Sequence, residues 1–87
     1  MSDDRMRSEE APAADKTLDA KGLNCPLPIM LANKSLKAVP AGGTLEIFAT
    51  DPGAAADFEA FCRATGNALI ESSANAGVYR FLIKRTA

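Results

Sequence analysis

The sequence of 87 residues predicts an α+β protein, a two-layer α/β sandwich with two helices on one face of a four-stranded mixed sheet. Three observations support this expectation. Stretches with an apolar period of two residues alternate with helical stretches in the order βαβαββ. Both helical stretches start at a proline and stop at glycine or proline. A chain of this length supports one domain at most, with a single small core.

Residues 1–15 are expected to be a disordered tail, and residues 16–87 to form the domain. The tail is rich in charge and alanine, and Met1 and Met6 are its only larger apolar side chains, so it has almost nothing to bury. It carries five acidic residues against two arginines, whereas the rest of the chain has a slight basic excess. Its charged start lacks the apolar segment of a secretory signal.

No apolar run approaches the roughly 18 residues that cross a bilayer, so a membrane protein is not expected. We therefore expect a cytoplasmic protein whose two cysteines stay reduced. The net charge of −1 is too small to indicate the concentrated basic face of a nucleic-acid-binding protein. A monomer with no direct nucleic-acid partner is expected.

The first strand is predicted at 17–20, where polar and apolar residues alternate. Gly22 then permits a sharp turn. Pro26 and Pro28 fall in the first turn of the following helix, where backbone N–H groups have no intrahelical partner. The strand, glycine and prolines together predict a tight connection from strand to helix.

Two starts stay open for this helix. In the first, Cys25 is the N-cap and Pro26 is the first helical residue. In the second, Leu27 is the cap, because a residue before proline avoids helical angles. Either start places Cys25 within about one turn of the helix N-terminus. The helix is expected to run to residue 38 or 39, where Pro40 and two glycines follow.

The second half of the chain predicts three strands and one helix. Residues 44–50 alternate like a strand with one apolar face. Asp51-Pro52 then signals a helix start, and an apolar stripe at helical spacing leads to Gly66. The stripe consists of Phe58, Phe61, Cys62 and Thr65. The remaining elements are a weak strand at 68–72, a turn at 73–77, and a strand at 78–84 with Tyr79, Phe81 and Ile83 on one face.

The composition excludes several common kinds of catalytic site. The absence of histidine removes the commonest general base, the Cys-His and Ser-His-Asp nucleophile pairs and imidazole metal ligands. Cys25 and Cys62 form no CxxC motif, so neither a zinc site nor a thioredoxin-like dithiol is expected. No cofactor and no metal are expected.

Cys25 is the candidate catalytic residue. At a helix N-terminus the macrodipole and free N–H groups favour the thiolate and lower the thiol pKa. Pro26 and Pro28 remove two of these donors, which leaves chiefly the N–H of Leu27 to bond the sulfur. The alternative is a small apolar cysteine buried at the corner between strand and helix. A cap position argues against burial because it faces solvent.

Cys62 is expected to be an inert buried thiol, because it shares the apolar stripe of the second helix. A resolving cysteine that forms a disulfide with Cys25 is the alternative.

The first helix is expected to have two apolar sides. The side predicted to pack on the sheet contains Ile29, Ala32, Leu36 and Val39. The opposite side contains Leu27, Met30 and Leu31. Together with Lys21, these three form a candidate partner-binding surface beside the reactive thiol. The alternative is that they are ordinary scattered surface hydrophobic residues.

Over residues 17–85 the chain resembles the TusA/SirA family of sulfur carriers. The matching segments are 18–28 with its CPxP run, then Asp51-Pro52-Gly53, Asp57-Phe58, Phe61-Cys62, and 79–83. A CPxP run alone is a weak signal, but it is a strong one after a short strand and a glycine in a βαβαββ chain. The family fold is similar to the C-terminal domain of translation initiation factor three, which agrees with the predicted sandwich.

The resemblance implies that Cys25 accepts sulfane sulfur as a persulfide from a cysteine desulfurase or rhodanese-like donor and relays it to an acceptor protein. In well-described members the sulfur reaches the 2-thio group of the tRNA wobble uridine, and relatives serve molybdenum-cofactor synthesis or sulfur oxidation. Such a protein is a carrier with a covalent intermediate more than a stand-alone enzyme. Two alternatives stay open: a thiol-based redox enzyme, and a regulatory or RNA-contacting module in which Cys25 is dispensable.

Overall fold

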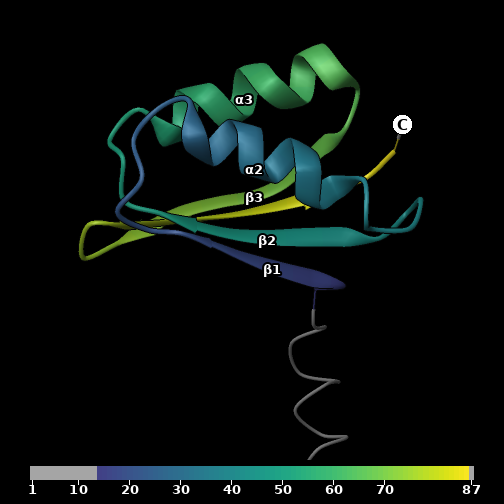
Figure 1. The fold of residues 1–87 in the computed structure, drawn as a ribbon, viewed down its shortest axis with the longest axis horizontal. Helices are drawn as coiled ribbons and strands as arrows, with labels where there is room; N and C mark the ends of the chain where they lie inside the picture. The colour runs from purple at the N-terminus through teal and green to yellow at the C-terminus, as the bar shows by residue number, and fades with distance from the viewer. Residues whose placement is uncertain (1–13, 87) are drawn as a thin grey trace, which may run out of the picture.

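The computed structural model describes residues 14–86, which form two layers (Figure 1). The elements are β1 (Lys16–Ala20), α2 (Leu27–Leu36), β2 (Thr44–Ala49), α3 (Ala54–Thr65), β3 (Ala68–Asn75) and β4 (Val78–Lys84). This order confirms the predicted βαβαββ pattern. Residues 1–13 of the expected disordered tail lie outside the described residues.

The four strands form one mixed sheet in the order β1-β2-β4-β3. β1 pairs with β2 in parallel, whereas β4 is antiparallel to both β2 and β3. Both helices cover the same face of the sheet, α2 over β1 and β2 and α3 over β3 and β4 (Figure 1). The predicted α+β sandwich is confirmed. Within residues 14–86, no helix has the length and apolar character that crossing a membrane requires.

The core lies between the sheet and the two helices. Its largest fully buried side chains are Phe58, Phe81, Leu45, Ile47, Ile83 and Val39. Full burial of one such side chain contributes about 1.5–3 kcal/mol. On α2 the predicted inward side is confirmed, since Ala32 and Leu36 are buried and Ile29 packs against the core. α2 ends at Leu36, two or three residues earlier than expected.

The β3–β4 hairpin is tighter than the sequence predicted. Residues 73–77 were expected to form the turn, but β3 continues to Asn75, which pairs with Val78. Ala76 and Gly77 alone make the turn, with φ of 53° and 81°. Positive φ at both central residues is the geometry of a type I′ turn, whose twist matches the flanking strands. The small residues at 73–75, which were expected in the turn, therefore belong to the strand.

Asp15 is attached to the sheet, although it was assigned to the tail. Its backbone N–H donates to the Thr44 carbonyl at 3.0 Å, and its carboxylate accepts from the Thr44 N–H at 2.9 Å. The ordered contacts of the domain thus begin at least one residue before the predicted boundary.

Gly43 provides a test of the packing at this end of the sheet. A Cβ at Gly43 would lie 2.5 Å from Asp15 Oδ2, 2.8 Å from Val39 Cγ1 and 3.0 Å from the Pro40 carbonyl oxygen. We predict that Gly43→Ala lowers the free energy of unfolding by about 1–3 kcal/mol through this overpacking, measured by urea denaturation. Gly53→Ala is the control, because its nearest atoms would lie 3.8 Å away. Equal stability of the two variants would contradict the prediction.

Candidate functional site

The candidate site lies where two loops leave the same edge of the sheet. Because β1 and β2 are parallel, the connections that follow them emerge at one end of the molecule, on the left in Figure 1. Gly22 in the first loop donates its N–H to Thr50 Oγ1 in the second at 2.9 Å. Gly22 has a φ of +83°, which a residue with a side chain rarely adopts. The turn predicted at this glycine is confirmed.

Cys25 occupies a four-residue turn ahead of α2. The turn is closed by the Leu27 N–H, which donates to the Asn24 carbonyl at 2.9 Å. The Cys25–Pro26 peptide bond is cis, so Pro26 holds the third position of a type VI turn and Cys25 the second. Cys25 is exposed and its thiol is free. The alternative of a buried corner cysteine is wrong for this residue.

Both predicted helix starts are displaced. The N-cap is Pro26, with φ of −101° and ψ of 16°, and Leu27 is the first helical residue. Cys25 therefore lies within a turn of the helix but is not its cap. The prediction that the Leu27 N–H bonds the sulfur is wrong, because the Asn24 carbonyl takes that donor. Pro28 follows at the second helical position and is buried.

The pKa of the Cys25 thiol is raised, whereas the sequence predicted a lowered value. The largest cause is a hydrogen bond from the thiol to the Asp57 carboxylate, followed by partial desolvation and by the negative charges of Asp57 and Asp51. A donor hydrogen bond stabilises the neutral thiol, and nearby carboxylates oppose the thiolate. The Leu27 N–H at the start of α2 donates to the Asn24 carbonyl, so it is not available to stabilise the thiolate.

Sequence reasoning missed Asp57. It lies in the first turn of α3, and Gly53 ahead of it lies close to both carboxylates: a Cβ there would be 3.8 Å from Asp51 Oδ2 and from Asp57 Oδ2. The signals in the sequence were the Asp51-Pro52 helix start and the Asp57-Phe58 segment that matches the family, neither of which was linked to Cys25. Parallel pairing brings the two helix starts together, so it also brings these carboxylates to the thiol.

Cys62 has the opposite environment to Cys25. It is 5% exposed on the inner side of α3, and burial raises its thiol pKa. The expectation that Cys62 is buried is confirmed. The Cys62 thiol is therefore shielded from the surface of the folded protein.

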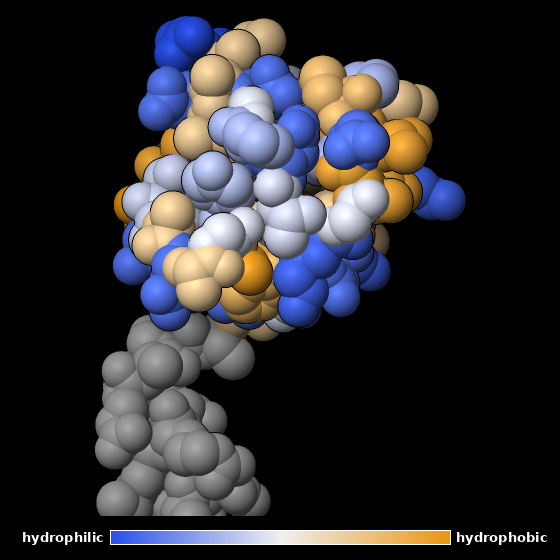
Figure 2. Space-filling view, turned by 90° about the vertical axis from the view of Figure 1, so that its left-hand side faces the viewer, coloured by the Kyte–Doolittle hydropathy of each residue, from blue (hydrophilic) through white to orange (hydrophobic). Residues whose placement is uncertain are grey.

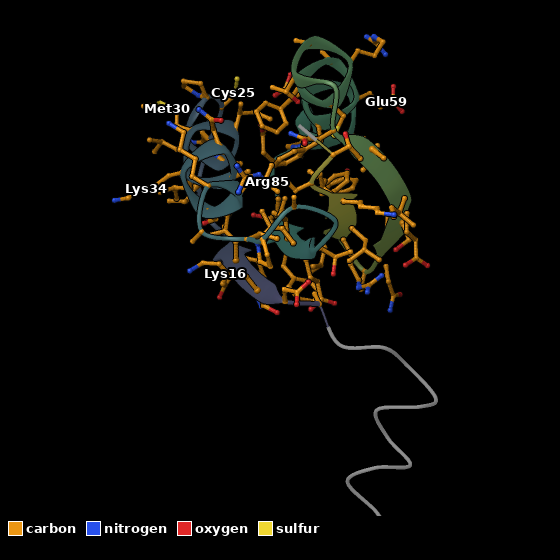
Figure 3. The ribbon with its side chains drawn as sticks, turned by 90° about the vertical axis from the view of Figure 1, so that its right-hand side faces the viewer. Lys16, Cys25, Met30, Lys34, Glu59 and Arg85 are labelled. Atoms are coloured by element: carbon orange, nitrogen blue, oxygen red, sulfur yellow. The ribbon has the colours of Figure 1, made fainter. Side chains whose placement is uncertain are left out.

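Exposed apolar residues gather at the start of α2. Leu27 is 45% and Met30 58% exposed, while Leu31 is half-buried. Figure 2, which looks at this end of the molecule, shows hydrophobic surface on the α2 side. Figure 3 shows that Cys25 and Met30 both point away from the sheet, Cys25 above α2 and Met30 on its outer side. We call the pair Leu27 and Met30 the α2 apolar patch.

Lys21 lies apart from the α2 apolar patch. Its ammonium group is 5.9 Å from the centre of the Phe48 ring. Phe48 lines a groove of about 420 Å³ on the open face of the sheet, together with Ser73, Asn75, Val78 and Arg80. The structure therefore brings Leu27 and Met30 together near Cys25 but directs Lys21 towards the opposite layer.

Comparisons with known proteins identify the family of this chain. A model of the family described as sulfurtransferase TusA matches residues 16–85. The chain belongs to the TusA family. The sulfur carrier protein TusA of Allochromatium vinosum is 53% identical over 72 residues, which cover 83% of this chain and 95% of the relative. The TusA of Pseudomonas entomophila is 42% identical over 73 residues, covering 84% and 91%.

The TusA-type fold is also seen in a solved structure. A SirA-like protein from Desulfitobacterium hafniense superposes with a TM-score of 0.72 at 24% identity, over 83% of this chain and 99% of that one. This similarity supports the fold. Among residues 14–86, no three or more Cys, Asp or Glu side chains group as they do around a metal ion.

The two thiols should differ in their reaction with iodoacetamide. We predict that Cys25 is alkylated in the folded protein, and that its rate keeps rising with pH beyond the range in which an unperturbed cysteine levels off, because the raised pKa delays thiolate formation. Cys62 should be modified only in denaturant. Peptide mass spectrometry at a series of pH values measures both rates. A Cys25 rate that levels off below the range of a free cysteine would contradict the assigned direction of its pKa.

Proposed function

We propose that this protein is a cytoplasmic, monomeric sulfur carrier that holds sulfane sulfur as a persulfide on Cys25. The donor is a cysteine desulfurase or a rhodanese-like protein, and the acceptor is a cysteine of a downstream protein. The observation that carries the proposal is the exposed, free Cys25 thiol in the Cys-Pro-Leu-Pro turn of a TusA family member. The relatives from Allochromatium and Pseudomonas bear the name sulfur carrier protein.

The transfer needs only thiol chemistry. The Cys25 sulfur attacks the terminal sulfur of the donor's persulfide, a new sulfur–sulfur bond forms on Cys25, and the donor's cysteine leaves. The proton lost by Cys25 is returned to that leaving thiolate, so charge and oxidation state balance across the pair. Repetition of the step with an acceptor thiolate passes the sulfur on and restores the Cys25 thiol.

The position of Cys25 suits a relay between proteins. It lies on a loop at the surface of a small domain, where a partner's active site can close over it. The α2 apolar patch next to Cys25 supplies a surface for that contact, since Met adapts to more than one partner. Pro26 and Pro28 hold the turn and the helix start that present the thiol.

The first test assigns the sulfur-bearing residue. We predict that Cys25→Ser, an almost isosteric change at an exposed position, preserves the fold but abolishes the mass gain of one sulfur after incubation with a cysteine desulfurase and cysteine. Cys62→Ala should load and transfer sulfur normally. Its stability should fall by about 1 kcal/mol, because a smaller side chain leaves space in the core.

Other outcomes point to other chemistry. Sulfur loading of the Cys25→Ser variant, or loss of sulfur transfer in a folded Cys62→Ala variant, would contradict the single-thiol relay and favour a dithiol mechanism. A gain of oxygen with peroxide, without any gain of sulfur, would favour the thiol-based redox enzyme.

The second test concerns the docking surface. We predict that Met30→Glu slows sulfur loading by about tenfold, because a charge replaces an apolar contact at the centre of the patch, while the circular dichroism spectrum stays unchanged. Ile70→Glu is the matched control: Ile70 is similarly exposed, at 53%, but lies on β3. Equal slowing by both variants would show that the effect is not local to the patch.

A further inference from the structure

The segment that carries Cys25 has few attachments to the rest of the domain. Of residues 21–26, which join β1 to α2, all but the half-buried Leu23 are exposed. The backbone of this segment makes mostly local hydrogen bonds: the Lys21 N–H to Asp19 Oδ1, the Leu23 N–H to the Ala20 carbonyl, and the Asn24 carbonyl from the Leu27 N–H. These bonds shape the turns but do not fix the segment against its neighbours.

One backbone hydrogen bond of this segment leads elsewhere. The Gly22 N–H donates to Thr50 Oγ1 at 2.9 Å, although the two residues are 28 positions apart in the chain. Within residues 14–86 it is the only hydrogen bond from the backbone of residues 21–26 to a residue outside β1, the segment itself and α2. The packing of the Leu23 side chain against the core adds attraction but little directionality.

The acceptor of this bond is fixed by the sheet. Thr50 directly follows Ala49, the last residue of β2, and Ala49 pairs with Ala20, the last residue of β1. Both alanines are fully buried. The Thr50 hydroxyl therefore extends from the end of two paired strands, and it reaches Gly22 only two residues after β1 ends. A φ of +83° at Gly22 belongs to the turn that brings this N–H to the hydroxyl.

We propose that Thr50 is a positioning residue for sulfur transfer: its hydroxyl oxygen holds the Cys25 segment in the orientation that a partner's active site accepts. The inference rests on the proposed carrier function and adds to it how the thiol is presented. Surface loops are mobile unless they are anchored. Without the Gly22–Thr50 hydrogen bond the segment samples other orientations, and the apparent affinity for a partner falls with the fraction that remains competent. Thr50 takes no part in the exchange of sulfur itself.

The first arm of the test measures loading by a cysteine desulfurase at several carrier concentrations. Thr50→Val keeps the β-branched shape of the side chain but removes the acceptor oxygen. We expect KM for the carrier to rise about fivefold with kcat nearly unchanged, which corresponds to about 1 kcal/mol, the net contribution of an ordinary hydrogen bond. Thr50→Ser keeps the hydroxyl and should restore KM to nearly that of the unaltered carrier.

The matched control is Thr17→Val, the same chemical change on β1. The Thr17 hydroxyl is exposed and donates to Glu46 Oε1 at 3.2 Å, on the open face of the sheet. Its loss should leave KM unchanged. An equal rise of KM in Thr17→Val, or a KM in Thr50→Ser as high as in Thr50→Val, would overturn the proposal. A fall in kcat at constant KM would also overturn it, because presentation of the thiol acts on docking.

The second arm uses the free carrier. Amide hydrogen exchange followed by NMR should show the Gly22 N–H exchanging about threefold faster or more in Thr50→Val, but not in Thr50→Ser. Equal Gly22 exchange in Thr50→Val and the unaltered carrier would overturn the proposal. This measurement involves no sulfur transfer, so its result is independent of the carrier function tested by Cys25→Ser.

Alkylation by iodoacetamide separates presentation from reactivity. A small reagent needs no docking, so Cys25 of free Thr50→Val should react within about twofold of the rate in the unaltered carrier. Buried Cys62 should stay unmodified, which excludes partial unfolding as the cause of a higher KM. A Cys25 alkylation rate that falls by the same factor as KM rises would trace the effect to the thiol itself and overturn the positioning role of Thr50.

Discussion

Parallel pairing of β1 with β2 is the constraint on which the site depends. Two neighbouring parallel strands must be joined by a crossover, and the connections that follow them leave from the same end of the sheet. The loops before α2 and α3 are therefore adjacent, and the hydrogen bond from Gly22 to Thr50 ties them together. Cys25 comes from the first loop, Asp51 from the second, and Asp57 from the first turn of α3 that follows it. No local feature of either loop creates that environment alone.

Stability and reactivity are separated in this small domain. The buried side chains of the two helices and of β2 and β4 meet in one core, and Cys62 belongs to it. Cys25 lies outside the core, in a turn closed by the Leu27 N–H, which donates to the Asn24 carbonyl. Two half-buried carboxylates, those of Asp57 and Asp51, contribute to the raised pKa of its thiol. Substitution of those charges should change reactivity with little effect on the fold.

The two faces of the molecule have different characters. The helical face carries the α2 apolar patch beside Cys25, whereas the open face of the sheet carries the Glu46–Arg80–Glu71 ion network and the groove beside Phe48. Lys21 is close to Cys25 in the sequence, but its ammonium group lies over the Phe48 ring on the open face. Proximity in the chain was thus a poor guide to which residues share a surface with the thiol.

The sequence alone determined the order of the elements, the inward sides of the helices and the glycine turn at Gly22, and it predicted Cys25 as the candidate reactive cysteine. These follow from apolar periodicity, from the dihedral limits of glycine and proline, and from the scarcity of other nucleophiles, all of which act locally. The turn was predicted less well: the Leu27 N–H was expected to bond the Cys25 sulfur, and only the folded backbone shows that it bonds the Asn24 carbonyl. The direction of the Cys25 pKa was decided by tertiary structure, because charge interactions depend on distance in space, and Asp57 reaches the thiol only after two parallel strands pair.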